Sequence, residues 1–224
     1  MPPRIPVDFF FDVFSPYSWI GFEGLLRYKN VWPIDVRLRP FYLAGIIKST
    51  KNPGAPMMLA QKHKYMEMDL KRNSKYWGIP VSLPKDFKDI VFTNSSAGAQ
   101  RLLIAVQRRQ QAKMEQMARA MWRRMFTEHT GVLDRNALLE ILNSLNVKNA
   151  EAMLEASTSN DIKEVLRSNT DDALAMGCFG APWIHVHTPS GNVEPFFGSD
   201  RLPLIGDLIG EDFQGPLKQF AEDF

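Results

Sequence analysis

The sequence predicts an α/β fold in which a long helical insertion splits a small sheet domain. Three observations support this prediction. Residues 5–39 carry a strand–helix–strand pattern, residues 183–208 carry a strand hairpin followed by a helix, and the segment between them has helical periodicity without a strand signal. With 224 residues, of which 45% are hydrophobic, the chain is long enough to bury a sizeable core.

The first unit starts with apolar residues at alternating positions in residues 5–14. Phe10 adds an apolar side chain to the opposite face, which is typical of a strand covered on both sides. Ser15-Pro16 then predicts an N-cap and the first turn of a helix that continues to Tyr28. Alternation from residue 34 to residue 39 predicts a second strand, parallel to the first.

The middle of the chain is predicted to be helical, with a Pro/Gly/Asn loop at residues 50–56 and an irregular stretch at residues 80–92. Asn94-Ser95-Ser96 predicts the cap of a long helix. Methionines at i+3 and i+4 spacing continue this pattern to Met125. Further helix starts are expected at the capping residues Asp134 and Ser159-Asn160.

Strands return near the end of the sequence. Residues 183–187 and 193–197 flank the turn at residues 188–191, and this pattern predicts a hairpin. Gly198-Ser199-Asp200 is then expected to cap a last helix that runs through Leu208. The order β-α-β followed by β-β-α is that of a thioredoxin-like fold. We therefore predict a thioredoxin-like domain from residues 1–47 and 176–224, with residues 48–175 as the inserted helical domain.

Composition excludes several classes of function. A formal net charge of +2 gives no argument for nucleic acid, and no apolar run approaches the ~20 residues that a membrane span requires. The single cysteine, Cys178, excludes an internal disulfide and any Cys-x-x-Cys metal site. His185 and His187 have metal-ligand spacing, but no third ligand lies nearby in sequence, and we expect no bound metal.

Ser15 is the first candidate for chemistry, because it lies where the first strand meets the first helix. A helix N-terminus favours an anion, and a hydroxyl can donate a hydrogen bond to a thiolate placed there. Two alternatives stay open from the residues alone. Ser15 could be a plain N-cap, or it could be a nucleophile, although the sequence has no Gly-x-Ser-x-Gly elbow.

Two further signals lie near the C-terminus. Pro182 directly precedes the third strand, and the N–H and C=O of Ala181 are expected to be free to pair with an extended peptide. Ser199-Asp200 offers a hydroxyl and main-chain donors for a carboxylate, together with a carboxylate for an ammonium, as an amino-acid head group requires. The alternatives are a turn proline without a ligand and a plain capping pair.

Four segments carry a resemblance to a known family: "FFFDVFSPYSWIGFEGLLRY", "DVRLRPFYLAGIIKSTKNP", "MGCFGAPW" and "FFGSDRLPLIGDLIG". They resemble the kappa-class glutathione transferases, which have a thioredoxin fold with a helical insertion and are related to disulfide oxidoreductases of the Cys-Pro-Tyr-Cys type. The resemblance covers essentially the whole chain. It implies that Ser15 holds the glutathione sulfur as a thiolate. The other contacts that it implies are Pro16 and Tyr17 from the same motif, Asn52, Lys62 at the glycyl carboxylate, the main chain of Ala181 before the cis-proline Pro182, and Ser199 and Asp200 at the γ-glutamyl end.

The resemblance also implies a function in detoxification. Glutathione would be the co-substrate, with no other cofactor, and the second substrate would be a small electrophile such as an aryl halide, or a hydroperoxide. The family is usually homodimeric and is found in mitochondria or peroxisomes, although the last residues do not form a Ser-Lys-Leu address. Candidates for an apolar acceptor pocket, or alternatively for interdomain core, are Tyr17, Trp19, Phe41, Met57, Met58, Tyr65 and Trp77.

Two other functions fit the same sequence features. An isomerase of the 2-hydroxychromene-2-carboxylate type shares this fold and uses glutathione. A non-catalytic binding module that has lost its redox cysteines would instead hold peptides through the loop at Ala181.

Overall fold

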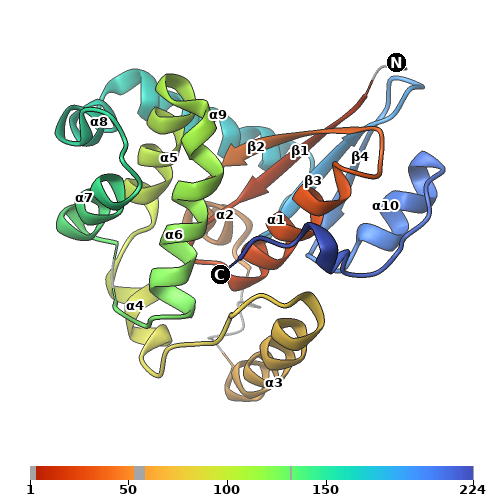
Figure 1. The fold of residues 1–224 in the computed structure, drawn as a ribbon, viewed down its shortest axis with the longest axis horizontal. Coiled ribbons are helices and arrows are strands. Elements are labelled where there is room, and N and C mark those ends of the chain that lie inside the picture. The colour runs from red at the N-terminus through yellow and green to blue at the C-terminus, as the bar shows by residue number, and fades with distance from the viewer. Residues whose placement is uncertain (1–3, 53–58, 132, 224) are drawn as a thin grey trace.

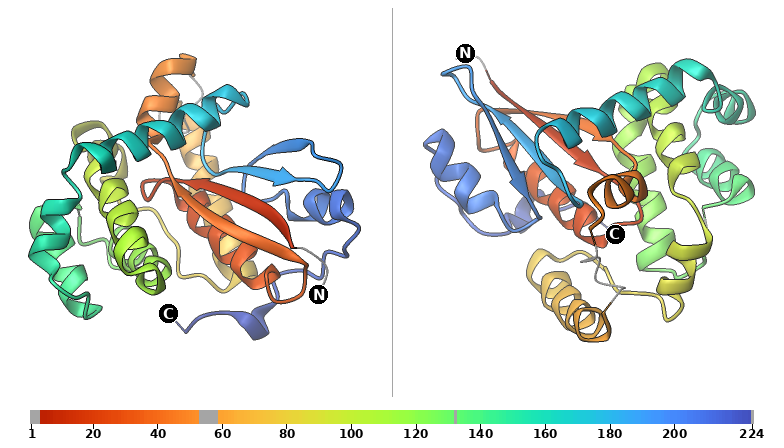
Figure 2. Two further views of the ribbon diagram at one scale, coloured as in Figure 1. Left: turned by 90° about the horizontal axis from the view of Figure 1, so that it is seen from above. Right: turned by 180° about the vertical axis from the view of Figure 1, so that it is seen from behind.

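The computed structural model describes residues 4–52, 59–131 and 133–223. A small sheet lies at the centre, with α1 on one face and α2 and α9 on the other, and most of the remaining helices gather at one side (Figures 1 and 2). The two faces of β1 divide the core accordingly. Phe9 and Phe11 pack with α1, whereas Phe10 packs with residues of α2 and α9.

The sheet has the strand order β2-β1-β3-β4. Its strands are β1 (Ile5–Phe11), β2 (Ile34–Pro40), β3 (Trp183–His187) and β4 (Val193–Phe197). β1 is parallel to β2 and antiparallel to β3, and β3 and β4 form an antiparallel hairpin. The predicted βαβ unit and the predicted hairpin are therefore confirmed.

β1 is shorter than the alternating pattern suggested. It ends at Phe11 and not at Phe14, because the side chain of Asp12 accepts the main-chain N–H of Phe14 at 2.9 Å. This local bond competes with strand pairing and turns the chain toward the first helix.

The first helix, α1 (Pro16–Tyr28), starts as predicted. Ser15 is the N-cap, and its side chain accepts the N–H of Ser18. Pro16 occupies the first turn, where its missing N–H is tolerated. α1 is buried along almost its whole length, and the ring of Phe22 packs against that of Trp122 from α6 with centroids 5.0 Å apart.

The helices of the central region account for most of the chain between the two halves of the sheet. Their bounds are α2 (Leu43–Thr50), α3 (Ala60–Trp77), α4 (Phe87–Thr93), α5 (Ala97–Arg109), α6 (Met114–Phe126), α7 (Arg135–Ser144), α8 (Ala150–Ala156) and α9 (Asn160–Ala175). Within the described part of residues 48–175 no strand is formed. α2 runs across residues 47 and 48, where we expected the insertion to begin, and the division into two domains stays a prediction.

Two expectations for the helical region were wrong. The stretch at residues 80–92 was expected to be irregular, but α4 begins within it. The expected single long helix is divided into α5 and α6 by a break at Gln110 and a short 3₁₀ turn, Gln111–Lys113. The side chain of Gln110 donates to the carbonyl of Lys148 at 3.0 Å and accepts its N–H at 3.1 Å, so the chain between α7 and α8 holds the break in place.

The caps of the later helices follow the sequence only in part. Asp134 caps α7 as predicted, by accepting the N–H of Ala137 at 2.8 Å. Ser159 is the N-cap of α9 but makes no side-chain capping bond. The last helix, α10 (Leu202–Ile209), starts after Arg201, so the prediction that Ser199-Asp200 caps it was wrong.

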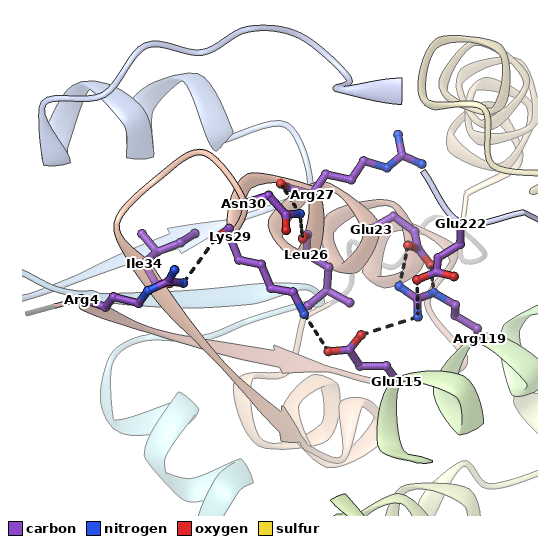
Figure 3. Close-up of polar contacts among 10 residues, drawn as sticks. All are labelled: Arg4, Glu23, Leu26, Arg27, Lys29, Asn30, Ile34, Glu115, Arg119 and Glu222. Atoms are coloured by element: carbon purple, nitrogen blue, oxygen red, sulfur yellow. Dashed lines mark hydrogen bonds and ion pairs between the residues drawn. The ribbon is translucent and has the colours of Figure 1, made fainter. Parts of the chain in front are cut away.

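A buried ion pair holds α1 against α6 (Figure 3). The carboxylate of Glu23, which is 1% exposed, accepts two hydrogen bonds from the guanidinium of Arg119, at 2.8 and 3.1 Å. Arg119 also lies 3.6 Å from Glu115 and 3.6 Å from Glu222 near the C-terminus, and Glu115 pairs with Lys29 at 3.0 Å. This network fixes the helix whose N-terminus carries Ser15.

Among the described residues, no helix combines the length and apolar composition needed to cross a membrane.

Candidate active site

Ser15 lies at the junction of β1 and α1 and is 5% exposed. Its Oγ accepts the N–H of Ser18 at 3.1 Å and donates to the carbonyl oxygen of Ala181 at 3.3 Å. Two loops that are far apart in sequence therefore meet at this hydroxyl. The expectation that the Ala181 carbonyl is unpaired was wrong, and the Ala181–Pro182 peptide bond is cis, as the family resemblance implied.

A cavity of about 440 Å³ opens beside Ser15. Six of the nine residues proposed from the sequence to bind glutathione line it: Ser15, Pro16, Tyr17, Asn52, Lys62 and Ala181. The other lining residues are Phe14, Leu43, Ile47, Met66, Phe87, Phe179, Gly180 and Phe197. The walls are mostly apolar, and a few polar groups are placed around Ser15, as is usual for sites that bind small molecules.

The remaining three proposed residues adjoin this cavity without lining it. The N–H of Gly198 donates to the carbonyl of Pro182 at 3.1 Å, which places the segment carrying Ser199 and Asp200 next to the Ala181 loop. Ser199 is buried, whereas Asp200 is exposed and lies 3.3 Å from the guanidinium of Arg201.

Tyr17 connects the N-terminus of α1 to α3. Its hydroxyl donates to Oδ2 of Asp69 at 2.8 Å. Burial, together with the hydrogen bond and the charge of Asp69, raises the pKa of the Tyr17 phenol well above its usual range, and the charge of Asp200 adds to this effect. Tyr17 is therefore a neutral hydrogen-bonding group, and the carboxylates of Asp69 and Asp200 both disfavour its ionisation.

An aromatic wall that sequence reasoning missed completes the site. The amide of Asn52 donates to the carbonyl of Phe179 at 2.8 Å, and the Phe179 ring lies 4.5 Å from that of Phe197. Both phenylalanines remain about two-fifths exposed, at 42% and 40%. The available signal was their position, since each directly precedes one of the two motifs that we singled out at Ala181 and Ser199.

Five of the seven residues proposed for the acceptor pocket are described by the structure, and they divide into a buried group and a cavity-lining group. Trp19, Phe41 and Trp77 are buried in the core, so the alternative assignment holds for them. Tyr17 and Tyr65 line a second, smaller cavity of about 350 Å³ together with Lys62. Met57 and Met58 lie outside the described residues.

The histidines and the cysteine have structural partners. His187 lies 2.7 Å from the carboxylate of Asp8, and His185 Nε2 accepts from the indole of Trp183 at 2.9 Å. In the parts of the chain that the structure describes, no three His, Cys, Asp or Glu side chains gather as metal ligands. Cys178 donates to the carbonyl of Gly180, and burial raises the pKa of its thiol to about 12. The thiol therefore stays protonated at neutral pH.

This arrangement suits binding of an anion better than nucleophilic attack by Ser15. The Ser15 proton points to a carbonyl oxygen, which cannot act as a general base. The N–H of Ser18 donates to Oγ and so makes the hydroxyl a better donor. The N-terminus of α1 adds its dipole at the same point. A thiolate or another compact anion in the cavity would be stabilised by the Ser15 hydroxyl, by the Ser18 N–H that polarises this hydroxyl, and by the dipole of α1.

The fold and this site define a thioredoxin-class protein without its own redox cysteines. A family model described as the DSBA-like thioredoxin domain matches residues 6–210. The chain is 43% identical over 220 residues to glutathione S-transferase kappa 2 of Caenorhabditis elegans, covering 98% of each chain. It is 35% identical over 213 residues to glutathione S-transferase kappa 1 of Homo sapiens, covering 94% of this chain and 93% of the human protein.

The chain therefore belongs to the kappa-class glutathione S-transferases within the DSBA-like thioredoxin family, and it is a glutathione transferase. A solved structure of 2-hydroxychromene-2-carboxylate isomerase has the same fold, with a TM-score of 0.75, 22% identity, and coverage of 92% of this chain and 94% of the isomerase.

Proposed function

We propose that the protein binds glutathione in the 440 Å³ cavity and that Ser15 holds the glutathione sulfur as a thiolate. The observation that carries this proposal is the Ser15 hydroxyl itself, which lies at the N-terminus of α1, at the wall of the cavity, and receives a hydrogen bond from Ser18. When glutathione enters, the Ser15 proton turns from the Ala181 carbonyl to the sulfur.

The energies involved are compatible with this role. A free thiol has a pKa near ~8.5, and lowering it by about two units requires ~2.7 kcal/mol. A hydrogen bond to a charged group contributes ~1.5–3 kcal/mol, and a helix N-terminus adds ~0.3–1 kcal/mol. Ser15 and α1 together can therefore keep most of the bound thiol ionised at neutral pH.

The other polar groups would hold the two ends of the tripeptide. Lys62 lines the cavity and carries the positive charge that the glycyl carboxylate requires. Asp200 supplies the negative charge for the γ-glutamyl ammonium, and the Ser199 hydroxyl is suited to the adjacent carboxylate. Asn52 and the main chain of Ala181 would orient the peptide between these ends.

The thiolate would then attack an electrophilic carbon, such as that of an activated aryl halide. A carbon–sulfur bond forms, the carbon–halogen bond breaks, and the halide leaves with the bonding electron pair. Reduction of a hydroperoxide is a second reaction of the same thiolate, in which two glutathione molecules are oxidised to the disulfide while the hydroperoxide becomes alcohol and water. The family resemblance further supports a homodimer, a detoxifying role and a location in mitochondria or peroxisomes.

The experiment that tests this function compares Ser15→Ala with Ser18→Ala. The Ser18 side chain is buried, its Oγ has no hydrogen-bond partner among the residues that the structure describes, and its alanine variant keeps the main-chain N–H that Ser15 uses. Loss of a hydrogen bond to a charged sulfur predicts a fall in kcat/KM of about 10- to 150-fold for Ser15→Ala. Ser18→Ala should stay close to the wild type. Wild-type turnover by Ser15→Ala would contradict the proposal.

The isomerase alternative is tested in the same assay. The enzyme is incubated with glutathione and either 1-chloro-2,4-dinitrobenzene or 2-hydroxychromene-2-carboxylate. We expect conjugation of the aryl halide and no isomerisation of the chromene acid. The kappa-class relatives support an enzyme, and so disfavour the non-catalytic binding module considered from the sequence.

A further inference from the structure

The turn that presents Ser15 is built around a buried carboxylate that the proposed function does not use. Asp12 is 0% exposed, and its carbonyl oxygen accepts the N–H of Ser15 at 2.9 Å. Its side chain accepts three further hydrogen bonds, from the N–H of Phe14 at 2.9 Å, the N–H of Leu43 at 2.9 Å and the hydroxyl of Ser96 at 2.7 Å. One residue thus joins the β1–α1 turn, the first residue of α2 and the start of α5.

Gln100 lies one turn further along α5, and its side chain forms hydrogen bonds with the main chain of the same region. Its side chain is fully buried. Nε2 donates to the carbonyls of Phe11 at 2.6 Å and Phe41 at 2.9 Å, and Oε1 accepts the N–H of Val13 at 3.3 Å. These partners lie at the ends of β1 and β2, so Gln100 ties the main chain just before the Ser15 turn to the end of β2.

A purely electrostatic role for Asp12 would oppose the chemistry. A carboxylate beside a site for a thiolate disfavours the second negative charge. Both carboxyl oxygens are instead used on N–H groups of Phe14 and Leu43, and these two residues line the cavity. The Asp12 carboxylate is therefore placed here because it holds the main chain of Phe14 and Leu43 in position.

We propose that Gln100, together with the Asp12–Ser96 pair, positions the Ser15 hydroxyl for the thiolate, so that the start of α5 acts as a support for the active-site turn. This inference rests on the proposed function of Ser15. These side chains act through Ser15 and are positioning residues. Loosening them should leave glutathione bound but move the hydroxyl away from the best geometry for donation to the sulfur.

The test uses neutral substitutions, because replacing Asp12 would also remove a charge near the thiolate. Gln100→Met keeps the length of the side chain and removes its hydrogen bonds. Gln107→Met is the matched control, since Gln107 lies two turns further along α5 and donates to the carbonyl of Leu38 in β2 at 2.9 Å. Ser96→Ala removes the hydroxyl donor to Asp12, and Ser96→Thr restores it.

The readout is the ultraviolet absorbance of the thiolate of bound glutathione, titrated against pH, alongside kcat, KM and Tm. We expect Gln100→Met to shift the midpoint upward by about one pH unit, with a matching tenfold fall in the ionisation constant. Ser96→Ala should shift it in the same direction, and Ser96→Thr should return it toward the wild type. Gln107→Met should lower Tm without moving the midpoint.

Three results separate the inference from the function on which it rests. If Gln100→Met and Ser96→Ala keep the wild-type midpoint while Ser15→Ala loses the thiolate, the support role is wrong and the role of Ser15 stands. If Gln107→Met shifts the midpoint as far as Gln100→Met does, the effect is general loosening and the inference is overturned. If Ser15→Ala itself keeps the thiolate, the proposed function fails. Should Gln100→Met not fold, the Ser96 pair decides between these outcomes.

Discussion

The buried carboxyl of Asp12 predicts a specific dependence of stability on pH. Burial raises its pKa from 3.8 to about 6, although the hydrogen bonds from Phe14, Leu43 and Ser96 favour the charged form. Since the pKa in the folded state is higher than in the unfolded state, the folded protein retains the proton longer. The contribution of Asp12 to stability is therefore fully present below pH 3.8 and is lost as the pH rises through about 6.

The size of this effect follows from the two pKa values. A difference of about two units at 1.36 kcal/mol per unit corresponds to about 3 kcal/mol of unfolding free energy, most of it lost between about pH 4 and pH 7. The perturbation is Asp12→Asn, which cannot titrate. The assay is urea unfolding of both proteins across this pH range without glutathione, and the quantity of interest is the difference between their unfolding free energies.

Groups that titrate alike in both proteins cancel in that difference. We expect the wild type to lose most of this ~3 kcal/mol relative to Asp12→Asn as the pH rises from about 4 to about 7. Asn also breaks at least one hydrogen bond, which moves the whole curve but leaves its pH dependence unchanged. Parallel curves for the two proteins would contradict this expectation, because they would show that Asp12 titrates alike in the folded and unfolded states.

Three further predictions follow from the site and its supports. Asp200→Ala should weaken glutathione binding about two- to fivefold by calorimetry, whereas Asp207→Ala on the exposed side of α10 should leave it unchanged; equal affinities would remove the γ-glutamyl assignment. Cys178 should react with an aromatic disulfide reagent much more slowly in the folded protein than in denaturant, since burial raises its pKa to about 12; rapid reaction would show an accessible thiolate. Arg119→Met should destabilise the fold by about 3–5 kcal/mol, because the buried Glu23 carboxylate loses its ion-pair partner and keeps only the hydrogen bond from the indole of Trp19; a loss below 1 kcal/mol in urea unfolding would contradict this.

Features with a local cause could be predicted from the sequence. Ser15-Pro16 forms the cap of α1, and the hairpin from Trp183 to Phe197 forms around its turn, because each signal depends on neighbouring residues. The break after α5 could not be predicted, since it depends on Gln110 meeting Lys148, which is far along the chain. The capping prediction at Ser199-Asp200 failed because α10 starts two residues later.

The same distinction applies to the site. The motifs around Ser15, Ala181 and Ser199 were visible as short patterns, and the structure brings them to one place. The hydrogen bonds of Asp12 and Gln100, which hold the active-site turn in place, could not be predicted from the sequence. Gln100 lies within the long helix predicted after residues 94–96, and Asp12 lies within the strand pattern of residues 5–14. Neither pattern shows the role of these side chains, because their partners lie on other segments of the chain, such as Ser96 for Asp12 and Phe11 for Gln100.

The central claim is that the Ser15 hydroxyl ionises the thiol of bound glutathione. Its most direct test is the thiolate absorbance of glutathione bound to the wild type and to Ser15→Ala, each titrated against pH at saturating glutathione. We expect a midpoint for the wild type about two units below ~8.5 and a midpoint for Ser15→Ala that returns most of the way to that of the free thiol. Equal midpoints for the two proteins, with glutathione bound to both, would contradict it.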